Sequence, residues 1–198
     1  MTDKFKKIQY NAPVTLTFTF MALSVLLFKE LLGDSFVKYL FINFRTSLTD
    51  PLQYIRLFSY IFGHSSWQHF SSNFLLILLL GPMLEEKYGS EEFIKMIFIT
   101  TFITGIINTL FLNTGLIGAS GIVFMMILLS SFANAKAGRI PLTLIIVVII
   151  FIGRELVDAI TVKDNISQMA HIIGGISGAI LGNIRIEKSK IRNTKNEV

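Results

Sequence analysis

Cysteine is absent from the sequence, and charged side chains are scarce. Without cysteine the chain can form no disulfide, no thiolate metal site and no cysteine nucleophile. Aspartate, glutamate, lysine and arginine make up 16% of the 198 residues, against about 25% in soluble domains. Hydrophobic residues make up 52%, and the mean hydropathy is +0.63. This composition is typical of a polytopic membrane protein.

Apolar segments long enough to cross a bilayer, about 20 residues, recur along the chain. We predict six spans, which run approximately over Val14–Leu32, Trp67–Glu85, Phe93–Leu112, Ser120–Ala135, Ile140–Leu156 and Ile166–Ile184. The fourth is short for a span, so we expect it to begin inside the protein rather than at a lipid surface. The predicted fold is an all-α membrane protein with six transmembrane helices.

Basic residues predict the orientation of these spans, because lysine and arginine concentrate on the cytoplasmic side. The tail 1–13, the turn between the fourth and fifth spans and the tail 185–198 are all basic. Both termini are therefore expected in the cytoplasm, with the membrane core over residues 14–184. This topology accounts for the net charge of +5, and we expect no nucleic-acid partner.

Polar residues stand at the outer ends of the even-numbered spans, which share one leaflet in this topology. Ser120 opens the fourth span, and His69 and Asn73 share one helical face near the start of the second. His171 follows Ile166 by five residues, about 7.5 Å along the helix axis. A polar group in hydrocarbon without a partner costs several kcal/mol. Each of these side chains therefore needs a partner or a function.

Glycines follow His171 at a spacing of four, at Gly174, Gly178 and Gly182. This pattern lets two helix backbones approach closely, so His171 is expected to face the helix that packs there. A histidine in such a position, taken alone, is more often a structural residue hydrogen-bonded to a neighbouring helix, and this alternative applies to His171. A Gly-x-Ser-Gly sequence, taken alone, is more often a flexible turn before a helix, and this alternative applies to Gly118–Gly121.

Together these residues describe acyl-transfer chemistry. A serine hydroxyl becomes a nucleophile when a base takes its proton, and His171 is at the right depth to serve Ser120. Backbone amides at the start of a helix, with His69 and Asn73, can donate to an oxyanion. Because no aspartate or glutamate is placed to orient His171, we expect a Ser-His dyad rather than a triad.

The three histidines could also form a zinc site. Two observations speak against it: His64-x4-His69 is not a common ligand pair, and no acidic residue lies nearby at ligand spacing. We expect neither a metal nor another cofactor.

The motifs, in their order and spacing, closely resemble those of the rhomboid family of intramembrane serine proteases. The matching elements are Arg56-x-Phe58, His64-x4-His69-x3-Asn73, Glu85-x3-Gly89, Gly118-x-Ser120-Gly121 and Ala170-His171-x2-Gly174-x3-Gly178. The similarity extends over about Arg56 to Gly182. It implies the compact six-helix bundle of the bacterial members.

The resemblance implies roles for individual residues. Ser120 would be the nucleophile and His171 the base, while His69, Asn73 and the Ser120 amide would form the oxyanion hole. His64 would be structural, near the mouth of the site.

Other elements of the family map onto this chain through the same resemblance. Many members have tyrosine at the position of Phe124, whose ring can still stack on His171. The segment from Gly33 to about Ser66 would be the large first loop. Its aromatic residues, Phe36, Tyr39, Phe41 and Phe44, suit a piece half-sunk in the outer leaflet. The fifth span and the loop from about Val157 to Asn165 would act as gate and cap.

The expected substrates are other membrane proteins within the lipid bilayer, cut at small residues where their spanning helix can unwind. The resemblance implies a multi-pass protein of a bacterial cell membrane whose site opens towards the extracytoplasmic side. The oligomeric state is left open by the sequence.

Two other functions are considered. An inactive rhomboid-like protein that binds membrane proteins would share the fold and would need neither Ser120 nor His171. A small transporter could use His171 and Asn73 as a relay, but it would be expected to carry acidic residues in mid-span, and the sequence has none there.

Overall fold

The computed structural model describes residues 9–112, 115–133, 142, 145–146, 149–150, 170–182 and 184. Its helices are α1 (Pro13–Leu32), α2 (Asp34–Phe41), α3 (Pro51–Ser59), the 3-10 turn Tyr60–Phe62, α4 (Trp67–Tyr88), α5 (Ser90–Ile107) with a π-helical continuation Asn108–Leu112, α6 (Ser120–Ala133) and the C-terminal helix Ala170–Gly182. In the described part of the chain, strand pairing is limited to one antiparallel bridge between Asn43 and Leu116. The all-α fold is therefore confirmed.

Among the described residues, two helices are long and apolar enough to cross a membrane: α1, and α5 taken with its continuation to Leu112. Shorter apolar helices run over Ser120–Ser131 and Ala170–Gly182. Pro13 is the first residue of α1, where its missing N–H and fixed φ are tolerated. Most of the predicted fifth span, the following loop and the start of the sixth span lie outside the described residues.

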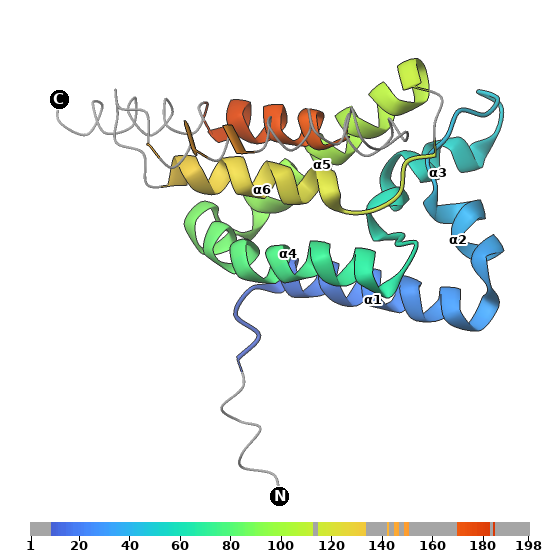
Figure 1. Ribbon diagram of the computed structural model, residues 1–198, viewed down its shortest axis with the longest axis horizontal. Coiled ribbons are helices and arrows are strands. Elements are labelled where there is room, and N and C mark those ends of the chain that lie inside the picture. The colour runs from blue at the N-terminus through green and yellow to red at the C-terminus, as the bar shows by residue number, and fades with distance from the viewer. Residues whose placement is uncertain are drawn as a thin grey trace, which may run out of the picture.

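The helices pack side by side, and α4 lies between α1 and α6 (Figure 1). The C-terminal helix, red in Figure 1, covers the other side of α6. Fully buried apolar side chains from α4, α5 and α6 form the core: Phe74, Ile77, Leu84, Phe93, Ile122, Met125, Met126 and Leu129. Large apolar side chains on the outer faces, such as Leu75, Leu79 and Phe98, are exposed, as expected where a helix faces lipid.

Far from the start of α6, a buried carboxylate ties three helix ends together. Glu85 accepts hydrogen bonds from the amides of Val14 (2.9 Å) and Thr15 (3.0 Å), and from the hydroxyls of Thr15 (2.9 Å) and Ser90 (2.7 Å). The first amides of a helix have no partner within it, and Glu85 supplies that partner for α1. Gly81 allows the close approach, since a Cβ there would lie 2.7 Å from Thr15 atoms. We call these residues the Glu85 cluster.

The segment from Gly33 to Ser66 was expected to be a large loop half-sunk in the outer leaflet, and its place relative to a membrane stays a prediction. It contains α2 and α3, and most of its aromatic residues contact protein. The ring of Phe36 lies 5.6 Å from that of Phe41, and Phe44 stacks under a guanidinium group. The side chains of Tyr39 and Tyr54 are 65% and 53% exposed.

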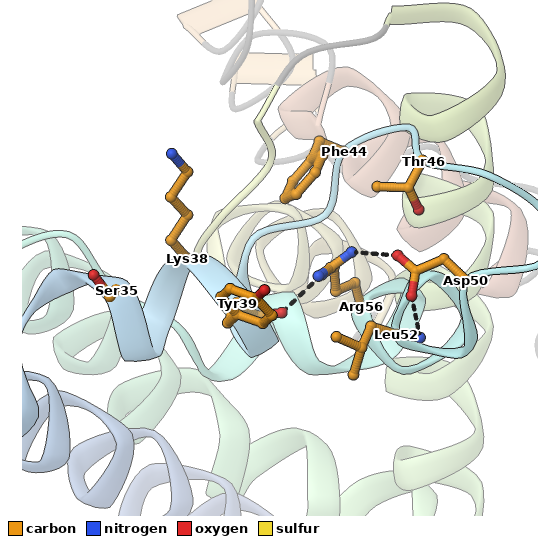
Figure 2. A pocket seen from close by; sticks show the side chains of 8 residues that line it. All are labelled: Ser35, Lys38, Tyr39, Phe44, Thr46, Asp50, Leu52 and Arg56. Atoms are coloured by element: carbon orange, nitrogen blue, oxygen red, sulfur yellow. Dashed lines mark hydrogen bonds and ion pairs between the residues drawn. The ribbon is translucent and has the colours of Figure 1, made fainter.

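Arg56 lies in α3 and contacts several parts of this segment. Its side chain is almost fully buried. Figure 2 shows its Nε donating to the Tyr39 carbonyl (2.8 Å) and its Nη1 to the Asp50 carboxylate (3.1 Å). The guanidinium carbon lies 4.7 Å from the centre of the Phe44 ring. A pocket of about 490 Å³ borders this group. Arg56 thus connects the end of α2 to the start of α3.

Candidate active site

The loop 115–119 brings the start of α6 to the start of α4. Gly118 has a φ of 109°, which favours glycine, and its amide donates to the Tyr60 carbonyl (2.9 Å). A Cβ at Gly118 would lie 2.7 Å from Cε1 and Nε2 of His69 and 3.7 Å from Nδ2 of Asn73. The side chains of His69 and Asn73 therefore lie against the backbone that leads into Ser120. The sequence motifs Gly-x-Ser-Gly and His-x3-Asn meet here.

The start of α4 orients the His69 ring. Ser66 caps the helix by accepting from the His69 amide (3.1 Å), and the Ser65 hydroxyl lies 3.2 Å from His69 Nδ1. If Ser65 donates to Nδ1, the neutral ring carries its proton on Nε2. That nitrogen faces Gly118. In that tautomer a hydrogen-bond donor faces the backbone just before Ser120.

His64 lies in the loop before α4, as predicted, and it is fully buried. Its Nδ1 is 3.3 Å from the Phe62 carbonyl, and its Nε2 is 3.2 Å from Asn73 Nδ2. Burial and the neighbouring His69 lower the pKa of His64 to about 4. At neutral pH the ring is therefore uncharged: Nδ1–H donates to Phe62, and Nε2 accepts from the Asn73 amide. This contact fixes the rotation of the Asn73 side chain.

Backbone contact between α6 and the C-terminal helix depends on glycine. A Cβ at Gly174 would collide with the Gly121 carbonyl oxygen, and one at Gly178 with the Met125 carbonyl oxygen. A Cβ at Gly121 would lie 3.2 Å from the Ala170 carbonyl oxygen. Gly174 and Gly178 therefore pack on α6, the helix that Ser120 begins.

His171 lies beside the same face of α6. Its ring centre is 4.3 Å from that of Phe124, at an interplanar angle of 40°. Phe124 follows Ser120 by four residues, so the two share a helical face. Both Ser120 and His171 are half-buried. The serine, the phenylalanine and the histidine are thus gathered along one side of α6.

Two residues at this site were not predicted from the sequence. Tyr60 accepts the Gly118 amide through its carbonyl and donates its hydroxyl to the Thr101 carbonyl (3.1 Å). The buried Thr104 hydroxyl would lie 3.9 Å from a Cβ at Gly121. The contact of Tyr60 uses a backbone carbonyl, and no residue type signals such a contact. Thr104 could have been found as a polar residue in an apolar span.

Metal binding was considered for the histidines. The rings of His64 and His69 are 4.9 Å apart between centres. Within the part of the chain that the structure describes, no three histidine, aspartate or glutamate side chains are grouped so that they could hold a metal ion.

Comparisons with known proteins identify the relatives of this chain. The family model for the rhomboid domain matches residues 51–188. The chain is 24% identical over 173 residues to rhomboid protease GlpG of Serratia proteamaculans (strain 568), covering 85% of this chain and 61% of that protein. It is 30% identical over 178 residues to rhomboid protease GluP of Bacillus subtilis (strain 168), covering 85% of this chain and 35% of that protein.

A plant protein is also similar. The chain is 28% identical over 137 residues to RHOMBOID-like protein 1 of Arabidopsis thaliana, covering 64% of this chain and 33% of that protein. The chain thus spans between about a third and three-fifths of the length of these relatives.

Proposed function

Because the chain belongs to the rhomboid family, and is therefore an integral membrane protein, we propose that it is an intramembrane serine endopeptidase. It hydrolyses peptide bonds in or near the transmembrane segments of other membrane proteins. The observation that carries the proposal is the convergence at the start of α6. The backbone before Ser120 lies against His69 and Asn73, while His171 lies against the same face of α6 through Phe124.

The proposed reaction begins with attack by the Ser120 hydroxyl oxygen on the scissile carbonyl carbon. His171 takes the hydroxyl proton, and a tetrahedral intermediate forms with its charge on the former carbonyl oxygen. His171 then returns the proton to the leaving amine. Water, with one proton taken by His171, then attacks the acyl-enzyme ester, and His171 gives that proton to the Ser120 oxygen as the carboxylic acid product leaves. The Phe124 ring supports the imidazole where a triad would use a carboxylate.

The oxyanion is stabilised by donors that stand ready before the reaction. They are Nε2–H of His69, Nδ2–H of Asn73 and the backbone amide of Ser120 at the start of α6. His64 is a positioning residue, since its Nε2 holds the Asn73 amide in one rotation. The loss of a single oxyanion donor typically costs about 10²–10³-fold in kcat.

In this proposal residues 14–184 form a six-helix core with both termini, 1–13 and 185–198, in the cytoplasm. The site then opens towards the extracytoplasmic side of a bacterial cell membrane. The substrates are transmembrane proteins that unwind locally at small residues, and the supporting glycines Gly118, Gly121, Gly174 and Gly178 hold the site's helices in contact.

The proposal is tested with purified protein in detergent and in liposomes, using a fluorophosphonate probe and a reconstituted transmembrane substrate. Wild-type protein should be labelled and should cleave. Ser120→Ala and His171→Ala should lose cleavage by about 10³-fold or more. Ser130→Ala is the matched control, because Ser130 lies on the same helix and its hydroxyl donates only to the Ile127 carbonyl (2.7 Å).

Unchanged cleavage by Ser120→Ala would overturn the proposal. Folded wild-type protein that is neither labelled nor active would instead favour the inactive rhomboid-like binder, which needs neither member of the dyad. Solute flux into the liposomes would favour a transporter.

A further inference from the structure

Asn43 lies outside every motif described above, between α2 and α3, and it is fully buried. Its side-chain nitrogen donates to the Gly105 carbonyl on α5 (2.9 Å). Its side-chain oxygen accepts from the Thr109 hydroxyl (2.9 Å) and from the Gln53 amide (3.4 Å). Every side-chain polar atom of Asn43 is thus bonded within the protein, chiefly to the end of α5.

The backbone of Asn43 reaches the loop that leads to the nucleophile. Its amide donates to the Leu116 carbonyl (2.9 Å), and its carbonyl accepts from the Leu116 amide (2.8 Å). The Asn108 side chain also donates to the Asn43 carbonyl (3.1 Å). Leu116 precedes Ser120 by four residues and is buried. One residue therefore connects the end of α5 to the loop 115–119. We call Asn43 with Gln53, Gly105, Asn108, Thr109 and Leu116 the Asn43 cluster.

The end of α5 is shaped to receive Asn43. A Cβ at Gly105 would lie 2.7 Å from the Leu57 carbonyl oxygen and 3.2 Å from Asn43 Nδ2. The Gly105 carbonyl accepts from the Asn43 amide, and it also lies 2.9 Å from the Thr109 hydroxyl, whose single proton it shares with Asn43 Oδ1. From Asn108 the helix continues with π geometry, a rare form that is frequent at functional sites.

The loop 115–119 is attached at two points before Ser120. Gly118 is bonded to the Tyr60 carbonyl, a backbone group that substitution does not remove. Leu116 is bonded to Asn43, which is itself fixed by its side chain. We propose that Asn43 is a positioning residue: its side chain fixes the bridge to Leu116 and thereby the place of the Ser120 hydroxyl relative to His69 and His171. This inference rests on the proposed function.

The effect on the reaction should be on the chemical step. A misplacement of about 1 Å can cost about 10²-fold in rate. Asn43→Ala removes both attachments to α5 and should lower kcat and the rate of fluorophosphonate labelling by about 10- to 100-fold. KM should change by less than about threefold, since no substrate contact is lost.

A gentler pair of variants is used in case Asn43→Ala does not fold. Thr109→Val keeps the shape of the side chain and loses the hydroxyl that donates to Asn43, so it should slow labelling by a smaller factor. Thr109→Ser keeps the hydroxyl and should label like wild type. Arg45→Ala is the matched control, because Arg45 donates to the Thr109 carbonyl (2.7 Å) and to the Leu110 carbonyl at the same helix end, and its hydrogen bonds among the described residues go to that end and not to the loop 115–119.

Hydrogen–deuterium exchange of peptides that contain Leu116 and Gly118 gives a readout that does not depend on activity. Exchange should be faster in Asn43→Ala and Thr109→Val than in wild type, Thr109→Ser or Arg45→Ala. Suppose that wild type is active and that labelling and exchange are unchanged in folded Asn43→Ala or Thr109→Val. This result overturns the role of Asn43 and leaves the proposed function standing. So does a loss of labelling that is equally large in Arg45→Ala. Unlabelled, inactive wild type overturns the proposed function instead, and the exchange result still decides whether Asn43 holds the loop.

Discussion

The Glu85 cluster and the Asn43 cluster are buried polar groups at opposite ends of α5. From Ser90 to Gly105 is fifteen residues, about 22 Å along the helix axis. Glu85 is charged, and all its described donors are amides and hydroxyls of helix ends. The side chains of the Asn43 cluster are neutral, and the cluster holds a loop.

Similar burial thus serves different purposes at the two ends of α5. A carboxylate forms stronger, charge-assisted hydrogen bonds, and at Glu85 these hold the ends of α1, α4 and α5 far from Ser120. Neutral amides have fixed donor and acceptor atoms, and at Asn43 these set the register of two backbone segments. We therefore expect Glu85 to matter mainly for stability and Asn43 mainly for the geometry of the site.

The largest expected effect on stability is that of Glu85→Ala. The substitution leaves two amides and two hydroxyls without their acceptor, and a buried polar group left unpaired costs about 1–3 kcal/mol. We expect the free energy of unfolding to fall by about 3 kcal/mol or more, measured by denaturant titration in detergent. Glu86→Ala, at the exposed neighbouring position, should change it little.

If the Glu85 cluster serves stability alone, the folded molecules of Glu85→Ala should keep the geometry of the proposed active site. Its labelling rate per folded molecule should stay within about threefold of wild type, because Glu85 contacts none of the proposed catalytic residues. A loss of labelling as large as that of Asn43→Ala, with stability unchanged, would break the distinction between the two clusters.

A smaller loss of stability is expected at the contact between α6 and the C-terminal helix. Gly174→Ala places a methyl group on the Gly121 carbonyl oxygen, and such overpacking typically costs about 1–3 kcal/mol. Since this contact carries His171, labelling should fall together with thermal stability. Ile176→Ala, which shortens an exposed side chain on the same helix, serves as the control. Normal labelling in Gly174→Ala would show that the helices do not meet at this glycine.

The smallest effect is expected for the charge pair of Arg56 and Asp50 near the Asn43 cluster, in which the arginine is buried and the aspartate is partly exposed. Desolvation raises the pKa of Asp50, but hydrogen bonds from Leu52, Thr46 and Arg56 outweigh it and hold the pKa below its usual value. Asp50 therefore stabilises the fold at pH values above the ordinary aspartate pKa of about 4, and the contribution is lost as the pH falls through the lowered value.

Asp50→Asn should lower the thermal midpoint slightly near neutral pH, and the difference from wild type should shrink below about pH 4. Asp34→Asn, at an exposed position, is the control. A difference that grows on acidification would contradict the assignment.

Much of the helical framework could be predicted from the sequence, because it follows from apolar length and small residues. The start of α6 at Ser120, the start of α4 at Trp67 and the packing of the glycines after His171 all follow local patterns. The helices α2 and α3 were missed because each is short and carries mixed side chains, so that neither has the length of a span.

The parts of the site that were missed depend on contacts between distant residues. Asn43 and Leu116 are 73 residues apart and meet through backbone atoms, which any residue type has. His64 could be placed in a loop, but its contact with Asn73 depends on how that loop turns back over α4. Such contacts are set by the packing of the bundle and leave no periodic pattern.

The proposed Ser-His dyad is tested most directly by identifying the residue that a fluorophosphonate modifies. Wild-type protein in detergent is incubated with the probe, digested and analysed by mass spectrometry, with His171→Ala and the Ser130→Ala control treated in parallel. The adduct should be found on Ser120 in wild type and Ser130→Ala and should be lost in folded His171→Ala. An adduct on another serine, or equal modification of Ser120 without His171, would contradict the dyad.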